Sequence, residues 1–200
     1  AVKVFEDGKR MLERIFELNL LSINGVYGFF KARSTDEKVE LLDCNVKFSF
    51  PRQLVDKSKP NLCLADFISP IGDDNIGLFA VTAGHGLEEI VNNYEKDFDD
   101  YNSIMVKVIA DRLAEAATEW LHEKVRKKDW GYAPEENFNN EELIKEKYVG
   151  IRPAPGYPSC PDHSEKDKIW KLLNVEKTVG ISLTESRAMI PASSVCGWDF

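Results

Sequence analysis

The chain has 200 residues, of which 43% are hydrophobic and 30% are charged, and these proportions exclude a disordered or fibrous protein. Its 34 acidic and 26 basic residues give a net charge of −8, which argues against the basic surface that nucleic-acid binding needs. No apolar run approaches the ~18 residues of a membrane span, and the first residues lack the order of a secretory signal. We therefore expect a cytoplasmic protein that binds neither nucleic acid nor membrane.

The four cysteines, Cys44, Cys63, Cys160 and Cys196, have neither the spacing of paired metal ligands nor the density of a disulfide framework. In a protein without an export signal they are expected to be reduced thiols. Cys160 and His163 lie close in sequence, but a structural zinc site takes four ligands. The sequence therefore predicts no metal site.

The first half of the sequence predicts one helix followed by several strands. Apolar residues repeat at helical spacing over 9–21. Short apolar segments bounded by turn residues predict strands at 26–30, 39–42 and 46–50. Residues 76–83 form a continuous apolar run between glycines and predict a central strand.

The second half predicts mainly helices. They are expected at residues 87–98, 100–128, 141–147 and 163–173. Four prolines in twelve residues make 150–161 a loop, and the last twenty residues are expected to hold short strands. This order of elements predicts a mixed α+β fold with antiparallel strands.

The helix expected at 100–128 is too apolar for a surface helix. Asp111 and Glu115 lie one turn apart on it, so either Lys107 neutralises Asp111 while Glu115 reaches solvent, or the pair is half-buried and faces a cation or a proton donor. One packed face is expected to contain Met105, Ile109, Leu113, Ala116 and Trp120, a second face Ala110, Ala114, Ala117 and Leu121, and a solvated stripe Arg112, Glu119, Glu123 and Arg126.

Two further features indicate a binding site. Asp66 is a carboxylate within the apolar run 62–68, and such a residue either caps a helix or contacts a positive group. The sequence leaves both readings open.

The loop over 150–158 is the most informative segment. Its three prolines fix φ near −65°, which lowers the entropic cost of holding Arg152 and Tyr157 in one geometry. Arg152 offers a planar donor fork that suits a carboxylate, and Tyr157 offers an aromatic face. Ala154 and Gly156 are expected to let a ligand approach closely. An ordered surface loop with a structural arginine is the alternative.

Parts of the sequence are compatible with two other functions. The strand at 76–83 leads into Gly84, His85 and Gly86 and then a helix, as in a Rossmann-type methyltransferase that uses S-adenosylmethionine. However, Glu89 stands at the third glycine of that fingerprint, and no clear βαβ continuation follows. The other function is a non-catalytic interaction domain that docks a partner through its acidic surface and has no small-molecule pocket.

Several stretches, in order along the chain, resemble one known family. They are residues 64–68, 99–107 with 111–116, 150–166, and 184–186 followed by 191–195. Together they resemble the activation domain of cobalamin-dependent methionine synthase. The resemblance implies a single C-shaped α+β domain over residues 1–200, with a central antiparallel sheet flanked by helices, that binds S-adenosylmethionine.

The same resemblance implies a repair reaction and its residues. Cob(II)alamin, the inactive oxidised form of the cofactor, would be returned to methylcobalamin by one electron and the methyl group of S-adenosylmethionine. Asp66 is implied to bind the α-amino group of the methyl donor and Arg152 its carboxylate. The other implied pocket residues are Tyr157, Glu115, Ala154 and the backbone near Pro153.

The implied partners are the cobalamin-binding domain of the same enzyme, with Glu89 and Asp111 facing it, and flavodoxin or a diflavin reductase as electron donor. The family is a 5-methyltetrahydrofolate–homocysteine methyltransferase, and without its other modules this chain is not expected to make methionine.

Two departures from the family affect these expectations. The family continues past the equivalent of Phe200 into a segment with a tyrosine pair that helps to hold S-adenosylmethionine, and Asp199 stands where the family usually has Tyr. We therefore expect a fragment with weakened binding and a frayed final strand. The absence of an initial Met likewise indicates a piece or a processed product.

Overall fold

The computed structural model describes residues 2–54, 60–72 and 74–200. The chain divides into two compact units. The first unit consists of Ala1–Val26, Ala80–Thr118 and Asn174–Val195, and the second of Tyr27–Phe79, Glu119–Leu173 and Cys196–Phe200.

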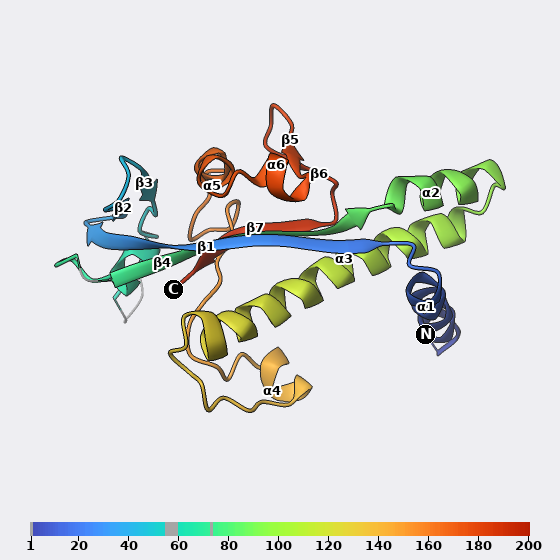
Figure 1. The fold of residues 1–200 in the computed structure, drawn as a ribbon, viewed down its shortest axis with the longest axis horizontal. Helices are drawn as coiled ribbons and strands as arrows, with labels where there is room; N and C mark the ends of the chain where they lie inside the picture. Colours follow the sequence, from blue (N-terminus) through green and yellow to red (C-terminus); the bar gives the residue numbers. More distant parts are fainter. Residues whose placement is uncertain (1, 55–59, 73) are drawn as a thin grey trace. The chain divides into compact units, whose positions relative to one another are not determined.

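The β structure consists of a five-stranded antiparallel sheet and a two-stranded sheet (Figure 1). The large sheet has the order β3-β2-β1-β4-β7. Its strands are β1 (Ser22–Thr35), β2 (Lys38–Leu41), β3 (Lys47–Ser49), β4 (Asp74–His85) and β7 (Ser194–Asp199), and the small sheet pairs β5 (Ser182–Leu183) with β6 (Met189–Ile190). Within the large sheet, Ala32 lies opposite Leu41 and Val39 opposite Phe48. The predicted α+β class and antiparallel sheet are confirmed.

The strand predicted at 76–83 is confirmed as the interior strand β4, which lies between β1 and β7. Its residues are buried from Ile76 to Gly84, because both of its faces are covered.

The helices follow the predicted order. They are α1 (Val2–Glu17), α2 (Leu87–Lys96), α3 (Asp100–Lys124), α4 (Asn140–Ile144), α5 (Glu165–Leu173) and α6 (Val175–Val179). A π-helical turn at Val125–Asp129 continues α3. The first helix begins earlier and ends sooner than predicted, and both α6 and a 3₁₀ turn at Leu64–Phe67 were absent from the prediction.

The core of the first unit lies where α1, α2 and α3 meet. Its buried residues are Met11, Ile15, Val91, Met105 and Val106. Phe16, which has the helical spacing of the same stripe, is instead 62% exposed. A packed apolar stripe therefore holds α1 in this unit.

The core of the second unit is aromatic. The ring of Trp198 packs edge-on against Phe48 and Phe50, with centroids 5.5 and 5.1 Å apart. Phe200 packs against Phe50 at 5.8 Å. Since Trp198 is fully buried within β7, the prediction of a frayed final strand is wrong.

The predicted small-residue face of α3 is buried at Ala110, Ala114 and Leu121, but the other two predicted faces differ from the structure. Trp120, expected on a packed face, is 63% exposed, and Arg126, expected in the solvated stripe, is fully buried. The buried side of the helix is the one with smaller residues, Val106, Ala110, Ala114, Thr118 and Leu121. Small side chains allow close contact with neighbouring elements, and this outweighs the larger area that Trp120 would bury.

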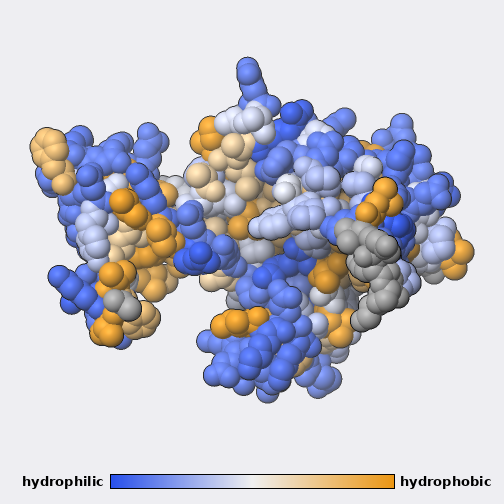
Figure 2. Space-filling view, turned by 180° about the vertical axis from the view of Figure 1, so that it is seen from behind, coloured by the Kyte–Doolittle hydropathy of each residue, from blue (hydrophilic) through white to orange (hydrophobic). Residues whose placement is uncertain are grey.

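No helix in the described ranges is long and apolar enough to cross a membrane. On the face drawn in Figure 2, hydrophilic side chains predominate and hydrophobic ones form scattered groups.

Candidate ligand-binding site

Asp66 lies in the 3₁₀ turn and makes both kinds of contact that the sequence left open. Its Oδ2 accepts a hydrogen bond from the backbone N–H of Cys63 at 2.9 Å, as in a cap. Arg52 donates to both carboxylate oxygens, at 2.5 and 2.7 Å. The hydrogen bonds from Arg52 lower the pKa of Asp66 to about 2, so the carboxylate is ionised near neutral pH.

The Asp66 carboxylate is only partly enclosed by its protein partners. A carboxylate offers about four lone-pair positions, and the described contacts come from Arg52 and from the backbone and side chain of Cys63. About 30% of the side chain remains exposed. The exposed part of the carboxylate can therefore be reached by a positively charged group from solvent.

The loop that carries Arg152 is held by backbone pairing with the end of the chain. Ile151 and Phe200 exchange hydrogen bonds at 3.3 and 3.0 Å, and the Trp198 N–H donates to the Pro153 carbonyl at 3.0 Å. The backbone near Pro153 was expected to line the pocket, and this stays a prediction. The three residues 151–153 thus continue the sheet beyond β7.

The guanidinium of Arg152 has two further contacts. Its Nη2 donates to Glu119 Oε2 at 2.5 Å, and its Nη1 donates to the Tyr148 hydroxyl at 3.3 Å. An arginine has five N–H donors, and 25% of this side chain is exposed. Donors therefore remain for an anionic ligand group.

Phe200 contacts the sequence neighbours of both Asp66 and Arg152 within the second unit. Its ring packs against Phe67, the neighbour of Asp66, with centroids 6.5 Å apart. Its backbone pairs with Ile151, the neighbour of Arg152. The fold thus links a carboxylate and an arginine that lie far apart in the sequence.

The end of the loop, residues 156–160, is held by backbone hydrogen bonds within the loop. The Gly156 N–H donates to the Cys160 carbonyl at 2.8 Å, and the Cys160 N–H donates to the Tyr157 carbonyl at 2.9 Å. A Cβ on Gly156 would lie 2.3 Å from the His163 ring, and its φ is +101°. The His163 ring therefore fills the side of Gly156 on which a Cβ would stand, while the residue itself is exposed, so close approach of a ligand there stays a prediction. Tyr157 is 66% exposed and Ala154 is half-buried.

Glu115 lies on α3 in the first unit, with 56% of its side chain exposed, and it pairs with Arg112 at 2.5 Å. The Ser193 hydroxyl donates to Asp111 at 2.6 Å, while Lys107 pairs with a glutamate of α2. Of the two readings left open, the structure therefore does not support a pairing of Lys107 with Asp111: Asp111 meets a proton donor and Glu115 a cation. A role for Glu115 in the pocket stays a prediction.

A buried polar cluster was missed by the sequence analysis. His122 and Asp199 are 1% and 2% exposed in the second unit, with Nε2 and Oδ1 3.8 Å apart. Burial raises the pKa of Asp199 to about 7 and lowers that of His122 to about 3. The available signal was that His122 and Arg126 lie one turn apart, each directly after an apolar residue, on a helix of unusually apolar composition.

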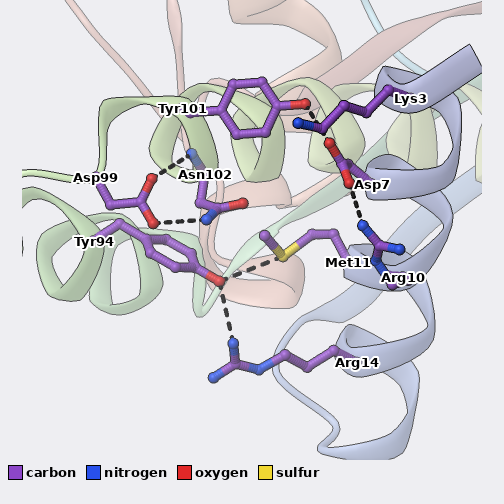
Figure 3. Close-up of a pocket in the computed structure, with 9 residues that line it drawn as sticks. All are labelled: Lys3, Asp7, Arg10, Met11, Arg14, Tyr94, Asp99, Tyr101 and Asn102. Carbon is purple, nitrogen blue, oxygen red and sulfur yellow. Dashed lines mark hydrogen bonds and ion pairs between the residues drawn. The ribbon is translucent and has the colours of Figure 1, made fainter.

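A cavity of about 580 Å³ in the first unit lies between α1 and the corner where α2 meets α3 (Figure 3). Asp7 binds Arg10 and accepts a hydrogen bond from the Tyr101 hydroxyl at 2.9 Å, and Arg14 contacts the Tyr94 hydroxyl at 3.4 Å. These polar groups contact one another across the cavity. They therefore fasten α1 to the corner, and the predicted site residues lie elsewhere.

Other segments of the chain fill the space beside the two glycines that a Rossmann-type nucleotide turn would use. A Cβ on Gly84 would lie 2.2 Å from Pro191, and one on Gly86 would lie 2.4 Å from the Leu20 carbonyl oxygen. The His85 ring contacts the Val179 carbonyl at 2.7 Å. Because β4 also belongs to an antiparallel sheet, a nucleotide turn at these glycines is not supported.

The chain is an α+β protein whose second unit contains a partly exposed carboxylate, Asp66, and a partly exposed arginine, Arg152. The chain belongs to the family described as vitamin B12 dependent methionine synthase, activation domain, whose sequence model matches residues 1–200. It is also similar to a solved structure titled "Crystal Structure of the MetH Reactivation Domain bound to AdoHcy", with a TM-score of 0.95 and 48% sequence identity. The match covers all of this chain and 65% of that one. The family predicted from the sequence is confirmed.

Proposed function

We propose that the chain is the S-adenosylmethionine-binding reactivation module of a cobalamin-dependent methionine synthase. The observation that carries the proposal is the linkage of Asp66 to Arg152 through Phe200 within one unit. A relative of 48% identity is a reactivation domain bound to AdoHcy, the product that S-adenosylmethionine leaves after losing its methyl group.

In this proposal Asp66 and Arg152 hold the amino-acid end of the ligand. The ammonium group binds the exposed part of the Asp66 carboxylate, and the ligand carboxylate accepts hydrogen bonds from the remaining donors of Arg152. Tyr157 is exposed and offers its ring face to the sulfonium or the adenine. Ala154 of the same loop is proposed as a further contact.

The proposed reaction converts cob(II)alamin to methylcobalamin with one electron and the methyl group of S-adenosylmethionine, and releases S-adenosylhomocysteine. Cobalamin supplies the nucleophile, and the sulfonium is already a good leaving group. This chain therefore needs no general base. Its residues bind the methyl donor and hold the methyl group in the orientation for transfer.

The rest of the system is proposed from the family. The cobalamin-binding domain of the same enzyme would present the cofactor, and flavodoxin or a diflavin reductase would supply the electron. Methionine formation from homocysteine and methyltetrahydrofolate would belong to other modules. The four free cysteines suit a reducing compartment such as the cytoplasm.

Isothermal titration calorimetry of the chain with S-adenosylmethionine and S-adenosylhomocysteine tests the proposal. We expect saturable one-to-one binding of both, and binding of adenosine at least ~10-fold weaker because it lacks the groups for Asp66 and Arg152. Absence of saturable binding by the folded chain, or equal affinity for adenosine, would overturn the proposal.

A further inference from the structure

Arg152 is the last member of a series of contacts that begins at a buried ion pair. Arg126 is fully buried and donates to both carboxylate oxygens of Glu136, at 2.8 and 2.6 Å. A bidentate pair of this kind has a defined geometry. The guanidinium of Arg126 therefore has one orientation in the second unit.

Tyr148 is the next member of the series. The Arg126 guanidinium lies 4.0 Å from the centroid of the Tyr148 ring, and the His122 ring packs edge-on against it at 5.2 Å. Two buried neighbours thus define where the Tyr148 hydroxyl lies. That hydroxyl accepts the hydrogen bond from Arg152 Nη1.

Glu119 contacts the same guanidinium from α3, one helical turn before His122. Its Oε2 accepts the 2.5 Å hydrogen bond from Arg152 Nη2. Its Oε1 is buried and has no hydrogen-bond partner among the described residues. About a quarter of the Glu119 side chain is exposed. Because a carboxylate oxygen is costly to bury without a partner, the contact with Arg152 is the main compensation for burying Oε1.

We propose that Glu119, together with the Tyr148 hydroxyl, positions Arg152 to receive the carboxylate of the ligand. The two contacts fix the plane of the guanidinium from two sides, so that its unused N–H donors face the ligand before it binds. Such preorganisation lowers the entropic cost of binding. The inference rests on the proposed function, because Arg152 is there the partner of the ligand carboxylate.

The charge around Arg152 is consistent with this role. The backbone pairing of 151–153 with β7 places Asp199 opposite Arg152. Burial keeps that carboxyl group largely protonated below neutral pH. Glu119 is therefore the one carboxylate in ion-pair contact with Arg152 among the described residues, and the guanidinium keeps attraction for a second carboxylate.

The test compares two ligands on matched variants of the whole chain. Titration calorimetry is run with S-adenosylhomocysteine and with its decarboxylated analogue, on wild type, Glu119→Ala and Tyr148→Phe. We expect Glu119→Ala to weaken binding of S-adenosylhomocysteine ~10-fold and Tyr148→Phe ~3-fold, with the decarboxylated analogue changed less than 2-fold in both. Glu123→Ala is the control, since Glu123 lies on the same helix and pairs with Lys127.

The outcomes separate this inference from the proposed function. If wild type binds S-adenosylhomocysteine and Glu119→Ala either leaves that affinity unchanged or tightens it, Glu119 does not position Arg152. Equal weakening of both ligands would show a general structural role and would also overturn the inference. Absence of binding by wild type would instead overturn the proposed function. Thermal melting of each variant checks that it is folded.

Discussion

Arg152 and Asp199 are cross-strand neighbours, brought opposite each other by the pairing of Ile151 with Phe200 and of Pro153 with Trp198. Arg152 favours ionisation of the Asp199 carboxyl group, yet burial raises the pKa of that group to about 7. Loss of hydration therefore outweighs the attraction of the nearby arginines. The Asp199 carboxyl group therefore holds a buried proton below neutral pH, beside the loop that carries Arg152.

Replacing Asp199 with Asn is expected to stabilise the fold in a pH-dependent way. The pKa of Asp199 is raised from 3.8 to about 7 on folding, so the folded state binds more protons between these values and wild-type stability falls as pH rises through that range. Asn stays neutral. The gain in free energy of unfolding over wild type should be near zero at about pH 4 and on the order of 2–4 kcal/mol at about pH 8. Urea unfolding at both pH values measures it, and an equal gain at the two would count against a buried carboxylic acid.

Replacing His122 with Gln is expected to remove the pH dependence of stability that opposes the one caused by Asp199. Burial lowers the pKa of His122 from 6.5 to about 3, so its contribution makes wild-type stability rise with pH over that interval. The slopes of His122 and Asp199 oppose each other where the intervals overlap. The variant should therefore lose ~2 kcal/mol or more of stability between about pH 4 and pH 6.5, where wild type changes little. Denaturation midpoints across this range check it, and a variant profile as flat as that of wild type contradicts it.

Gly156→Ala is expected to destabilise the loop. The new methyl group would lie 2.3 Å from the His163 ring, on a backbone with φ of +101°. Overlap and left-handed strain together should cost about 1–3 kcal/mol. Differential scanning calorimetry gives the loss. His163→Ala in the same chain should recover only the part due to overlap, and a Gly156→Ala variant as stable as wild type would refute the packing described here.

Asp66→Asn is expected to weaken binding of S-adenosylmethionine about 10-fold, or ~1.4 kcal/mol, because a neutral amide is a poorer partner for the ammonium group. Adenosine, which has no ammonium group, should bind as before. Asp43→Asn is the control, since Asp43 is also exposed and belongs to the same unit. Calorimetric titration of both variants gives the comparison. An Asp66→Asn chain that binds the methyl donor as tightly as wild type would remove Asp66 from the site.

Local patterns were sufficient to predict most elements of the fold. The uninterrupted apolar run at 76–83 predicted an interior strand, and the density of prolines predicted the loop that carries Arg152. Both depend on interactions within a few residues of the chain. The resemblance carried by 150–166 then predicted the family, which the match over residues 1–200 confirms.

The environment of charged side chains could not be predicted in the same way. Arg126 has the helical position of a solvated residue, but Glu136 and Tyr148 cover it from segments that follow the helix. Gly156 has a permissive backbone, but the His163 ring fills the side on which a Cβ would stand. In each case the deciding partner comes from another segment, whose position only the tertiary fold determines.

The most direct test of the central claim is calorimetric titration of Arg152→Ala with S-adenosylhomocysteine, with circular dichroism confirming an intact fold. Loss of a charge-assisted carboxylate pair should weaken binding by about 2 kcal/mol or more, roughly 30-fold. Affinity equal to that of wild type in a folded variant would contradict the assignment of Arg152 to the ligand carboxylate.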